Sequence, residues 1–189
     1  VPMVSFVPRA ALTLYQSGRS SGVVVDIGRY QCHAVPIYEG FVIAHAIVST
    51  CVGWDDAKRE QTHEEGYTIT ENKSELSNDI LFEPKDSEMK LGIHEMTASA
   101  IVKCSFREPL YANILLAGRA SLFADLQDRL QSEMVTLSPP QFRIDVTSAG
   151  QWDWLRGSVV AFTKEFQAKW VSLSEYEQAG PSILLHRCP

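Results

Sequence analysis

A carboxylate and a glycine follow directly after a buried strand pattern near the start of the chain. In GVVVDIGRYQCHAVPIYEG, residues 22–40, three valines lead into Asp26 and Gly28. A turn that holds phosphate presents backbone N–H groups at close range, and it therefore needs small residues. Arg29 and Tyr30 are large, although arginine itself binds phosphate well. The stretch is compatible with a nucleotide-binding turn and with a hairpin in which Asp26 caps the turn.

The remaining residues form no local motif for catalysis or metal binding. The five histidines are scattered along the chain, and no two of them have the spacing of metal ligands. These histidines are His33, His45, His63, His94 and His186. The four cysteines contain no C-x-x-C pair, which favours reduced thiols. Since a Walker loop and a local Ser/His/Asp set are also missing from the sequence, we predict no catalytic and no metal-ligating residues.

Composition and charge exclude several classes of protein. The 189 residues are 45% hydrophobic, enough for one globular domain or two small lobes. The 17 basic and 23 acidic residues give a net charge of -6, without a basic stripe. We therefore expect no nucleic-acid and no membrane partner. The apolar runs are shorter than a membrane span.

Periodicity predicts an α/β architecture, in which strands alternate with helices. The segment 49–88 is polar, and we interpret it as a surface lobe or a long excursion. A capping box formed by Ser174 and Glu177 is expected to begin a short final helix. Helices are predicted at 8–17, 121–137 and 157–170, and strands at 23–25, around a turn at Glu39–Gly40, before residue 118, and at 142–146.

Several consecutive stretches resemble actin and the actin-related proteins. The matching stretches are SGRSSGVVVDIG, HAVPIYEG, GIHEMTASAIVKC, LYANILLAG and GPSILLHRC, and they occur in the order of the carboxy-terminal half of that family. The resemblance implies the α/β fold shared by actin, Hsp70 and sugar kinases, with only its second half-domain present. It further implies that 1–189 is one truncated actin-like domain. Its large-lobe core then lies at 1–48 and 89–189, and a reduced small lobe lies at 49–88.

The resemblance assigns residual ATP-loop positions to Asp26, Gly28, Gly118 and Phe123. Other positions in these loops have changed from the family pattern. Arg29 and Tyr30 replace an acid and a glycine, Arg119 replaces a glycine, and Arg9 replaces the glutamine that positions water beside a histidine, here His33. Arginine has no acceptor and stays protonated, so it cannot activate water. We therefore expect no ATP hydrolysis and no bound cofactor.

The resemblance also implies a cleft that receives helices of partner proteins. One wall corresponds to Tyr15, Gly18 and Ser20, and the other to Val160, Thr163 and Lys169. The second wall is more polar than in the family, and helix binding depends on apolar anchors. Binding to the usual partners, which are actin or actin-associated proteins, should therefore be weakened or redirected.

Three hypotheses follow for the function. The first is a degenerate, non-catalytic actin-like protein of the cytoplasm and cytoskeleton, with the nucleus as an alternative, that acts as a structural or partner-binding subunit. The second is an ATP-binding, filament-forming subunit with Mg²⁺, completed by a missing N-terminal half. The third is a damaged product that barely folds, because a half-actin exposes the apolar face that meets its other half.

Overall fold

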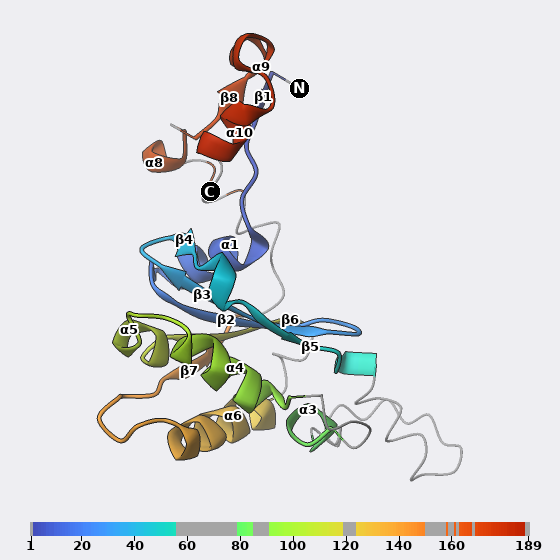
Figure 1. The fold of residues 1–189 in the computed structure, drawn as a ribbon, viewed down its shortest axis with the longest axis vertical. Coiled ribbons are helices and arrows are strands. Elements are labelled where there is room, and N and C mark those ends of the chain that lie inside the picture. The colour runs from blue at the N-terminus through green and yellow to red at the C-terminus, as the bar shows by residue number, and fades with distance from the viewer. Residues whose placement is uncertain are drawn as a thin grey trace.

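The fold is given by a computed structural model, which describes residues 2–55, 79–84, 91–118, 124–149, 158, 161, 163–167 and 169–187. A mixed six-stranded sheet forms its centre, in the order β4-β3-β2-β6-β7, with β5 also paired to β3 (Figure 1). β2 pairs antiparallel with β3 and parallel with β6, and β6 is parallel to β7. The strands are β2 (Gly22–Ile27), β3 (Cys32–Tyr38), β4 (Phe41–Val42), β5 (Val48–Thr50), β6 (Ile114–Gly118) and β7 (Val146–Ser148).

The valine run of β2 is buried on both faces, as the unbroken apolar pattern predicts. Val23 and Val25 belong to the larger core, whereas Val24 belongs to a smaller core on the opposite face. The same alternation divides β6, in which Leu115 faces the smaller core and Leu116 the larger one. The sheet is therefore the middle layer of the molecule.

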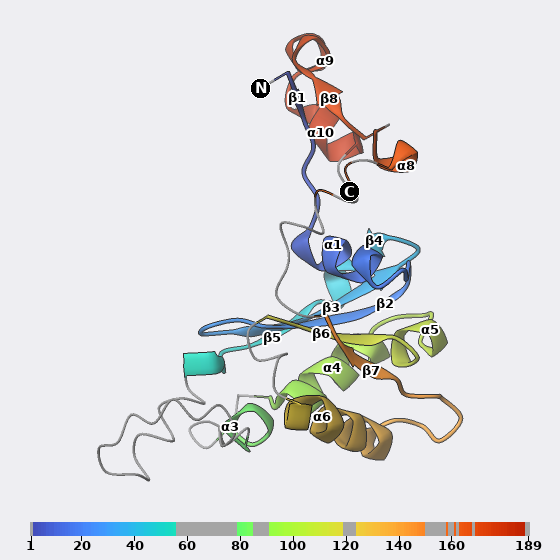
Figure 2. The ribbon, with the colours of Figure 1, turned by 180° about the vertical axis from the view of Figure 1, so that it is seen from behind.

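Helices cover both faces of the sheet, as Figures 1 and 2 show. On one face lies α1 (Arg9–Gln16), which contributes Ala11 and Leu14 to the smaller core. The opposite face is covered by α3 (Asp79–Phe82), α4 (Ile93–Val102), α5 (Glu108–Tyr111) and α6 (Ala124–Leu137). On α6, the four-residue spacing of Leu126, Leu130 and Met134 buries all three completely.

The hairpin of β3 and β4 turns at Glu39 and Gly40, as predicted. Both residues have positive φ, 49° and 84°, as two-residue hairpin turns require. Gly40 donates its N–H to the Ser20 carbonyl at 2.7 Å, and a Cβ at Gly40 would lie 2.3 Å from the Tyr15 hydroxyl. The hairpin is thus held against the end of α1. After it come η1 (Ala44–Ala46) and β5.

A smaller unit is formed by the two ends of the described chain. β1 (Met3–Val4) pairs antiparallel with β8 (Val171–Ser172) in a two-stranded sheet. Around it lie α8 (Lys164–Gln167), α9 (Leu173–Ala179) and α10 (Ser182–Arg187). Figures 1 and 2 show this unit apart from the six-stranded sheet, beyond α1. We call these elements the terminal unit.

Some predicted boundaries are wrong. The strand predicted at 142–146 is β7 and begins only at Val146, since the preceding Ile144 carbonyl accepts a hydrogen bond from a side chain of α6. The helix predicted after Ser174 is α9. It begins two residues earlier than predicted, because Ser172 caps it and Glu175 closes the capping box. The helix predicted at 157–170 is interrupted by a bend at Thr163 within its described residues.

The segment 49–88 lies partly outside the described residues. Within the described part, Val52, Leu81 and Phe82 are buried in the larger core beneath the sheet. These three residues therefore pack in the same core as the six-stranded sheet. None of the described helices has the length and apolar character needed to cross a membrane.

Candidate functional site

The predicted loop residues Asp26, Gly28 and Gly118 lie together at the carboxyl ends of β2 and β6. In the parallel register Asp26 is opposite Ala117, and Ile27 is opposite Gly118. Gly118 has a φ of 89°, and a Cβ there would lie 2.3 Å from the Ile27 carbonyl oxygen. Ligands of α/β proteins bind at such strand ends. The structure thus brings Gly118 beside Asp26 and Gly28, from which it is far apart in the sequence.

The carboxylate of Asp26 is paired with the side chain of Arg9, the first residue of α1. Nη2 of Arg9 donates to Oδ1 of Asp26 at 2.7 Å. The Asp26 side chain is 22% exposed, and that of Arg9 is 55% exposed. The arginine that replaces the family glutamine therefore contacts the acid that opens the loop.

The turn after Asp26 is closed by hydrogen bonds within the chain. Gly28 donates its N–H to the Gln31 carbonyl at 2.9 Å, so this backbone donor is already used. The carbonyls of Gly28 and Arg29 accept from the N–H groups of Trp54 and Asp55, at 3.0 and 2.9 Å. Residues 54–55 thereby hold the outer side of the turn.

A second ion pair joins the turn after Asp26 to residues 54–55. Nε of Arg29 donates to Oδ2 of Asp55 at 2.7 Å, and this hydrogen bond and the charge of Asp55 raise the pKa of Arg29. The Arg29 guanidinium also lies 5.1 Å from the ring centre of Tyr30, which is 59% exposed. Arg29 and Tyr30 are therefore exposed side chains at the rim of the turn.

No sequence pattern indicates the role of Asp55. It lies in a polar segment without a motif, and only the folded chain brings it to Arg29. The structure also sets Asp26, His33 and Ser49 opposite one another on adjacent strands. A local motif search misses this row because its members come from β2, β3 and β5.

Phe123 and Arg119, predicted at the adenosine loop, lie outside the described residues. Among the residues that the structure does describe, no group of three or more His, Cys, Asp or Glu side chains could hold a metal ion. Cys32 and Cys104 are buried, and Cys51 is exposed. Burial raises the pKa of the Cys104 thiol.

The predicted cleft walls lie on different parts of the structure. Tyr15 is in α1, and Gly18 and Ser20 are in the loop after it. Thr163 and Lys169 flank α8, which Figures 1 and 2 show in the terminal unit, whereas Val160 is outside the described residues. Thr163 is exposed, and Lys169 is half-buried. A partner cleft between these walls stays a prediction.

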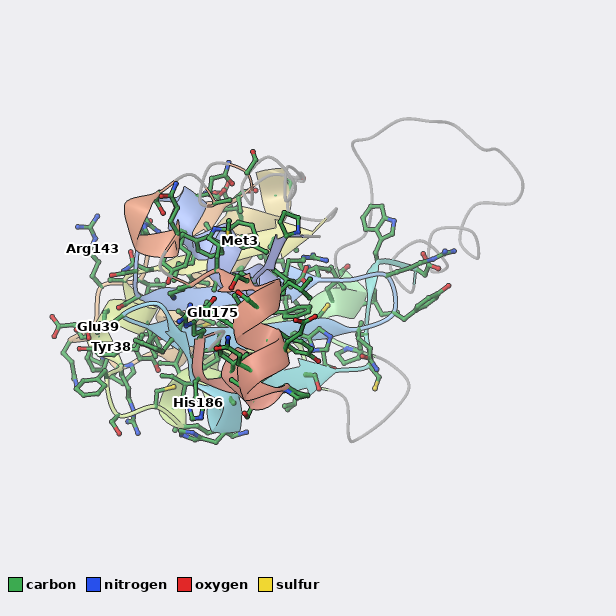
Figure 3. The ribbon with its side chains drawn as sticks, turned by 90° about the horizontal axis from the view of Figure 1, so that it is seen from above. Met3, Tyr38, Glu39, Arg143, Glu175 and His186 are labelled. Atoms are coloured by element: carbon green, nitrogen blue, oxygen red, sulfur yellow. The ribbon has the colours of Figure 1, made fainter. Side chains whose placement is uncertain are left out.

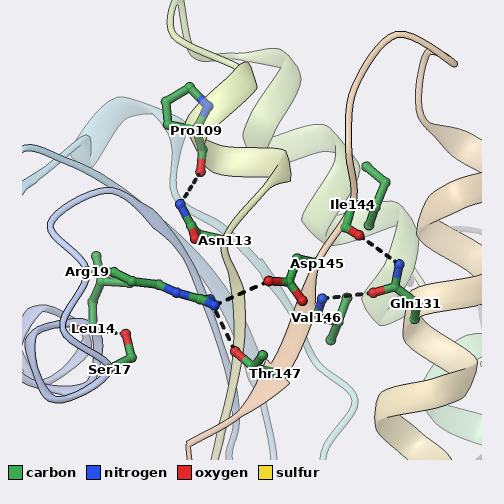
Figure 4. Close-up of polar contacts among 10 residues, drawn as sticks. All are labelled: Leu14, Ser17, Arg19, Pro109, Asn113, Gln131, Ile144, Asp145, Val146 and Thr147. Carbon is green, nitrogen blue, oxygen red and sulfur yellow. Dashed lines mark hydrogen bonds and ion pairs between the residues drawn. The ribbon is translucent and has the colours of Figure 1, made fainter.

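Polar side chains fix the far edge of the sheet (Figure 4). The Gln131 amide on α6 donates to the Ile144 carbonyl at 2.9 Å and accepts from the Val146 N–H at 2.8 Å. Arg19, in the loop after α1, reaches Asp145 at 3.2 Å and Thr147 at 3.3 Å. β7 is thus held from both faces, and it in turn supports β6.

The mixed sheet, its helical layers and the strand-end site together define an α/β protein of the kind that binds ligands at the ends of parallel strands. The family model described as Actin matches residues 1–64 and 55–189. The chain therefore belongs to the actin family, as its resemblance indicated. The actin-like α/β fold is confirmed.

The family implies ATP with a divalent cation at this site, and the described residues fit that group poorly. The Asp26 carboxylate binds a guanidinium, and the Gly28 N–H binds Gln31. The Ile27 carbonyl lies close enough to Gly118 that a Cβ there would be 2.3 Å from its oxygen. A phosphate and its metal need free N–H donors and free carboxylate oxygens. Here Oδ1 of Asp26 and the N–H of Gly28 are engaged within the chain.

Proposed function

We propose that this actin-family protein is a non-catalytic structural or partner-binding subunit. The observation that carries the proposal is the internal bonding of the strand-end site, above all the Arg9–Asp26 ion pair. Arg9 is always protonated and offers no acceptor, so it cannot orient or deprotonate an attacking water. A phosphate or metal ion at Asp26 would have to compete with the Arg9 guanidinium and with the hydrogen bond between Gly28 and Gln31.

Partner binding is supported by an aromatic surface at the end of β3 that lies away from the strand-end site. The rings of Tyr38 and Phe106 stack with centroids 4.4 Å apart. Phe41 is the cross-strand partner of Tyr38, so its ring projects on the same face. Phe41 and Phe106 are 61% and 56% exposed. Figure 3 shows Tyr38 and Glu39 at the rim of the molecule in the view from above.

Two of these residues, Tyr38 and Phe41, flank a turn that is already ordered, through the Gly40–Ser20 hydrogen bond and a bond from the Glu39 N–H to the Ser21 hydroxyl at 2.9 Å. Preorganised aromatic side chains contribute strongly to protein interfaces, because little side-chain entropy is lost on binding. We propose that the partner is actin or an actin-associated protein, in the cytoplasm or cytoskeleton.

The catalytic part of the proposal is tested with purified chain and Mg-ATP. We expect no saturable heat of binding at micromolar nucleotide and no phosphate release above the buffer rate. Purified actin, measured in parallel, is the positive control. A micromolar affinity together with turnover would favour the alternative, an ATP-binding subunit that a further segment completes.

The partner-binding part is tested by co-sedimentation with purified actin filaments. We expect Phe41→Ser and Phe106→Ser, combined, to lower the bound fraction several-fold. Val135→Ser is the matched control, because Val135 is 56% exposed but lies on α6. Equal loss in both variants, or no binding by the unmodified chain, would contradict this surface.

A further inference from the structure

The Arg9–Asp26 pair resembles a metal site in its electrostatics. Asp26 is the next-to-last residue of β2, where the strand ends meet, and its side chain is mostly shielded from water. A carboxylate in such a place is destabilised by desolvation unless a cation neutralises it. The Arg9 guanidinium, 2.7 Å away, supplies that charge.

A guanidinium carried by the chain differs from a metal ion in one respect. It cannot dissociate, and it stays charged at every pH at which the protein folds. Arg9 is also the first residue of α1, and the helix is anchored by Ala11 and Leu14 in the smaller core. Its position opposite Asp26 is therefore set by packing and not by the concentration of a solute.

We propose that Arg9 is a tethered counter-ion, which takes the place of a dissociable divalent cation at Asp26. The second pair, Arg29 with Asp55, does the same for the outer side of the turn. The fold of this chain consequently does not depend on a divalent cation or on nucleotide. This inference goes beyond the proposed function, since a non-catalytic subunit could still need a cation for folding.

The test measures thermal unfolding of the full chain in EDTA, in magnesium chloride and in Mg-ATP. The melting temperature of the unmodified chain should be the same in all three. For Arg9→Gln we expect a melting temperature about 1–4 °C lower in EDTA, since partly exposed ion pairs contribute little. Magnesium should restore part of that loss, through binding to the freed carboxylate.

Three further variants complete the design. Arg9→Lys should keep most of the stability and remain insensitive to magnesium, because it keeps the charge. Asp26→Asn and the double variant Arg9→Gln with Asp26→Asn should show no response to magnesium, since the carboxylate is gone. If Arg9→Gln does not fold, the magnesium response of the unmodified chain and of Arg9→Lys still decides the matter.

Two results would overturn the inference. One is a saturable rise in the melting temperature of the unmodified chain with magnesium, which would show that a dissociable cation still binds. The other is an Arg9→Gln variant that melts like the unmodified chain and ignores magnesium. Neither concerns partner binding, whereas ATP turnover by the unmodified chain would contradict the proposed function itself.

Discussion

At the scale of single residues, two glycines differ in how strongly their surroundings restrict a larger side chain. Gly118 and Gly18 both have positive φ, 89° and 72°. They differ in their surroundings, because a Cβ at Gly118 meets the Ile27 carbonyl, whereas a Cβ at Gly18 meets nothing within 4 Å. A comparison of alanine substitutions at these two glycines therefore distinguishes the cost of backbone strain, which both have, from the cost of a steric clash, which only Gly118 has.

We predict that Gly118→Ala lowers the free energy of unfolding by about 2–4 kcal/mol, and Gly18→Ala by only about 1–2 kcal/mol. The left-handed conformation strains both alanines, but only the first displaces backbone of β2. Urea unfolding followed by circular dichroism measures both values. Equal losses would show that β6 shifts to accommodate the methyl group.

The residue scale also limits what sequence alone could predict of the site. A local pattern singles out Asp26 and Gly28, the family resemblance adds Gly118, and parallel pairing of β2 with β6 brings the three together. The partners of Asp26 and Arg29 could not be predicted in the same way. An ion pair between Arg29 and Asp55 depends on how residues 54–55 return to the turn, and no periodicity records that path.

At the scale of elements, the Gln131 side chain on α6 hydrogen-bonds to the backbone at the edge strand β7, where a further strand would otherwise pair. Its amide accepts from the Val146 N–H of the strand and donates to the Ile144 carbonyl just before it. Gln131→Leu keeps a similar volume but leaves both groups unsatisfied. We predict a loss of about 1–3 kcal/mol in the free energy of unfolding.

The same measurement includes a neighbouring control. Ser132→Ala removes an exposed hydroxyl on α6 that bonds only within the helix, and it should change stability by less than about 0.5 kcal/mol. Amide exchange at Val146 should also accelerate in Gln131→Leu. Unchanged exchange there would mean that water replaces the glutamine without loss.

The capping box of α9 makes this element sensitive to acid. Glu175 accepts hydrogen bonds from the backbone and side chain of Ser172 and pairs with Arg187, and these contacts lower its pKa. The stabilisation is therefore complete above the unfolded value of about 4.3, and it disappears as the pH falls through the lower folded value. Carboxyl NMR titration should give a midpoint below the ordinary value for glutamate.

Glu175→Gln provides the comparison. It keeps a hydrogen-bond acceptor for Ser172 but has no charge to lose, so the Ser172 signals should change less between neutral and acidic pH than in the unmodified chain. A Glu175 midpoint at or above the ordinary value would contradict the capping geometry. The sequence located this helix but shifted its cap by two residues, because Ser172 and Ser174 are equally good capping residues.

At the scale of the whole molecule, the sheet and the terminal unit differ in how much they bury. β2 and β6 are almost wholly buried, whereas no residue of α9 is. Local opening requires little free energy where few apolar contacts are lost. We predict that α9 amides exchange on the order of a hundredfold faster than those of β2.

Hydrogen exchange followed by mass spectrometry tests this difference, with the buried helix α4 as the helical control. The α4 amides should exchange as slowly as the sheet. If α9 were as protected as α4, the terminal unit would unfold together with the sheet. That result would contradict the separation seen in Figures 1 and 2.

The architecture could be predicted because the strongest patterns are those of buried elements. The valine run of β2 and the leucine spacing of α6 both predict burial, and the residues concerned are buried in the structure. The terminal unit was not predicted, because two-residue strands carry too little periodicity to be recognised. Its pairing of Met3 with Ser172 depends on contacts between the two ends of the chain.

The central pairing of β2 with β6 sets residue 23 against residue 114. The entropy of closing so large a loop grows only with the logarithm of its length, by about 0.6 kcal/mol for each doubling. The chain between these strands also contains β3, β5 and α4, which pack on the same sheet. Inserted residues should therefore leave the sheet intact only where they fall between these elements, whereas deletions within them should disrupt it.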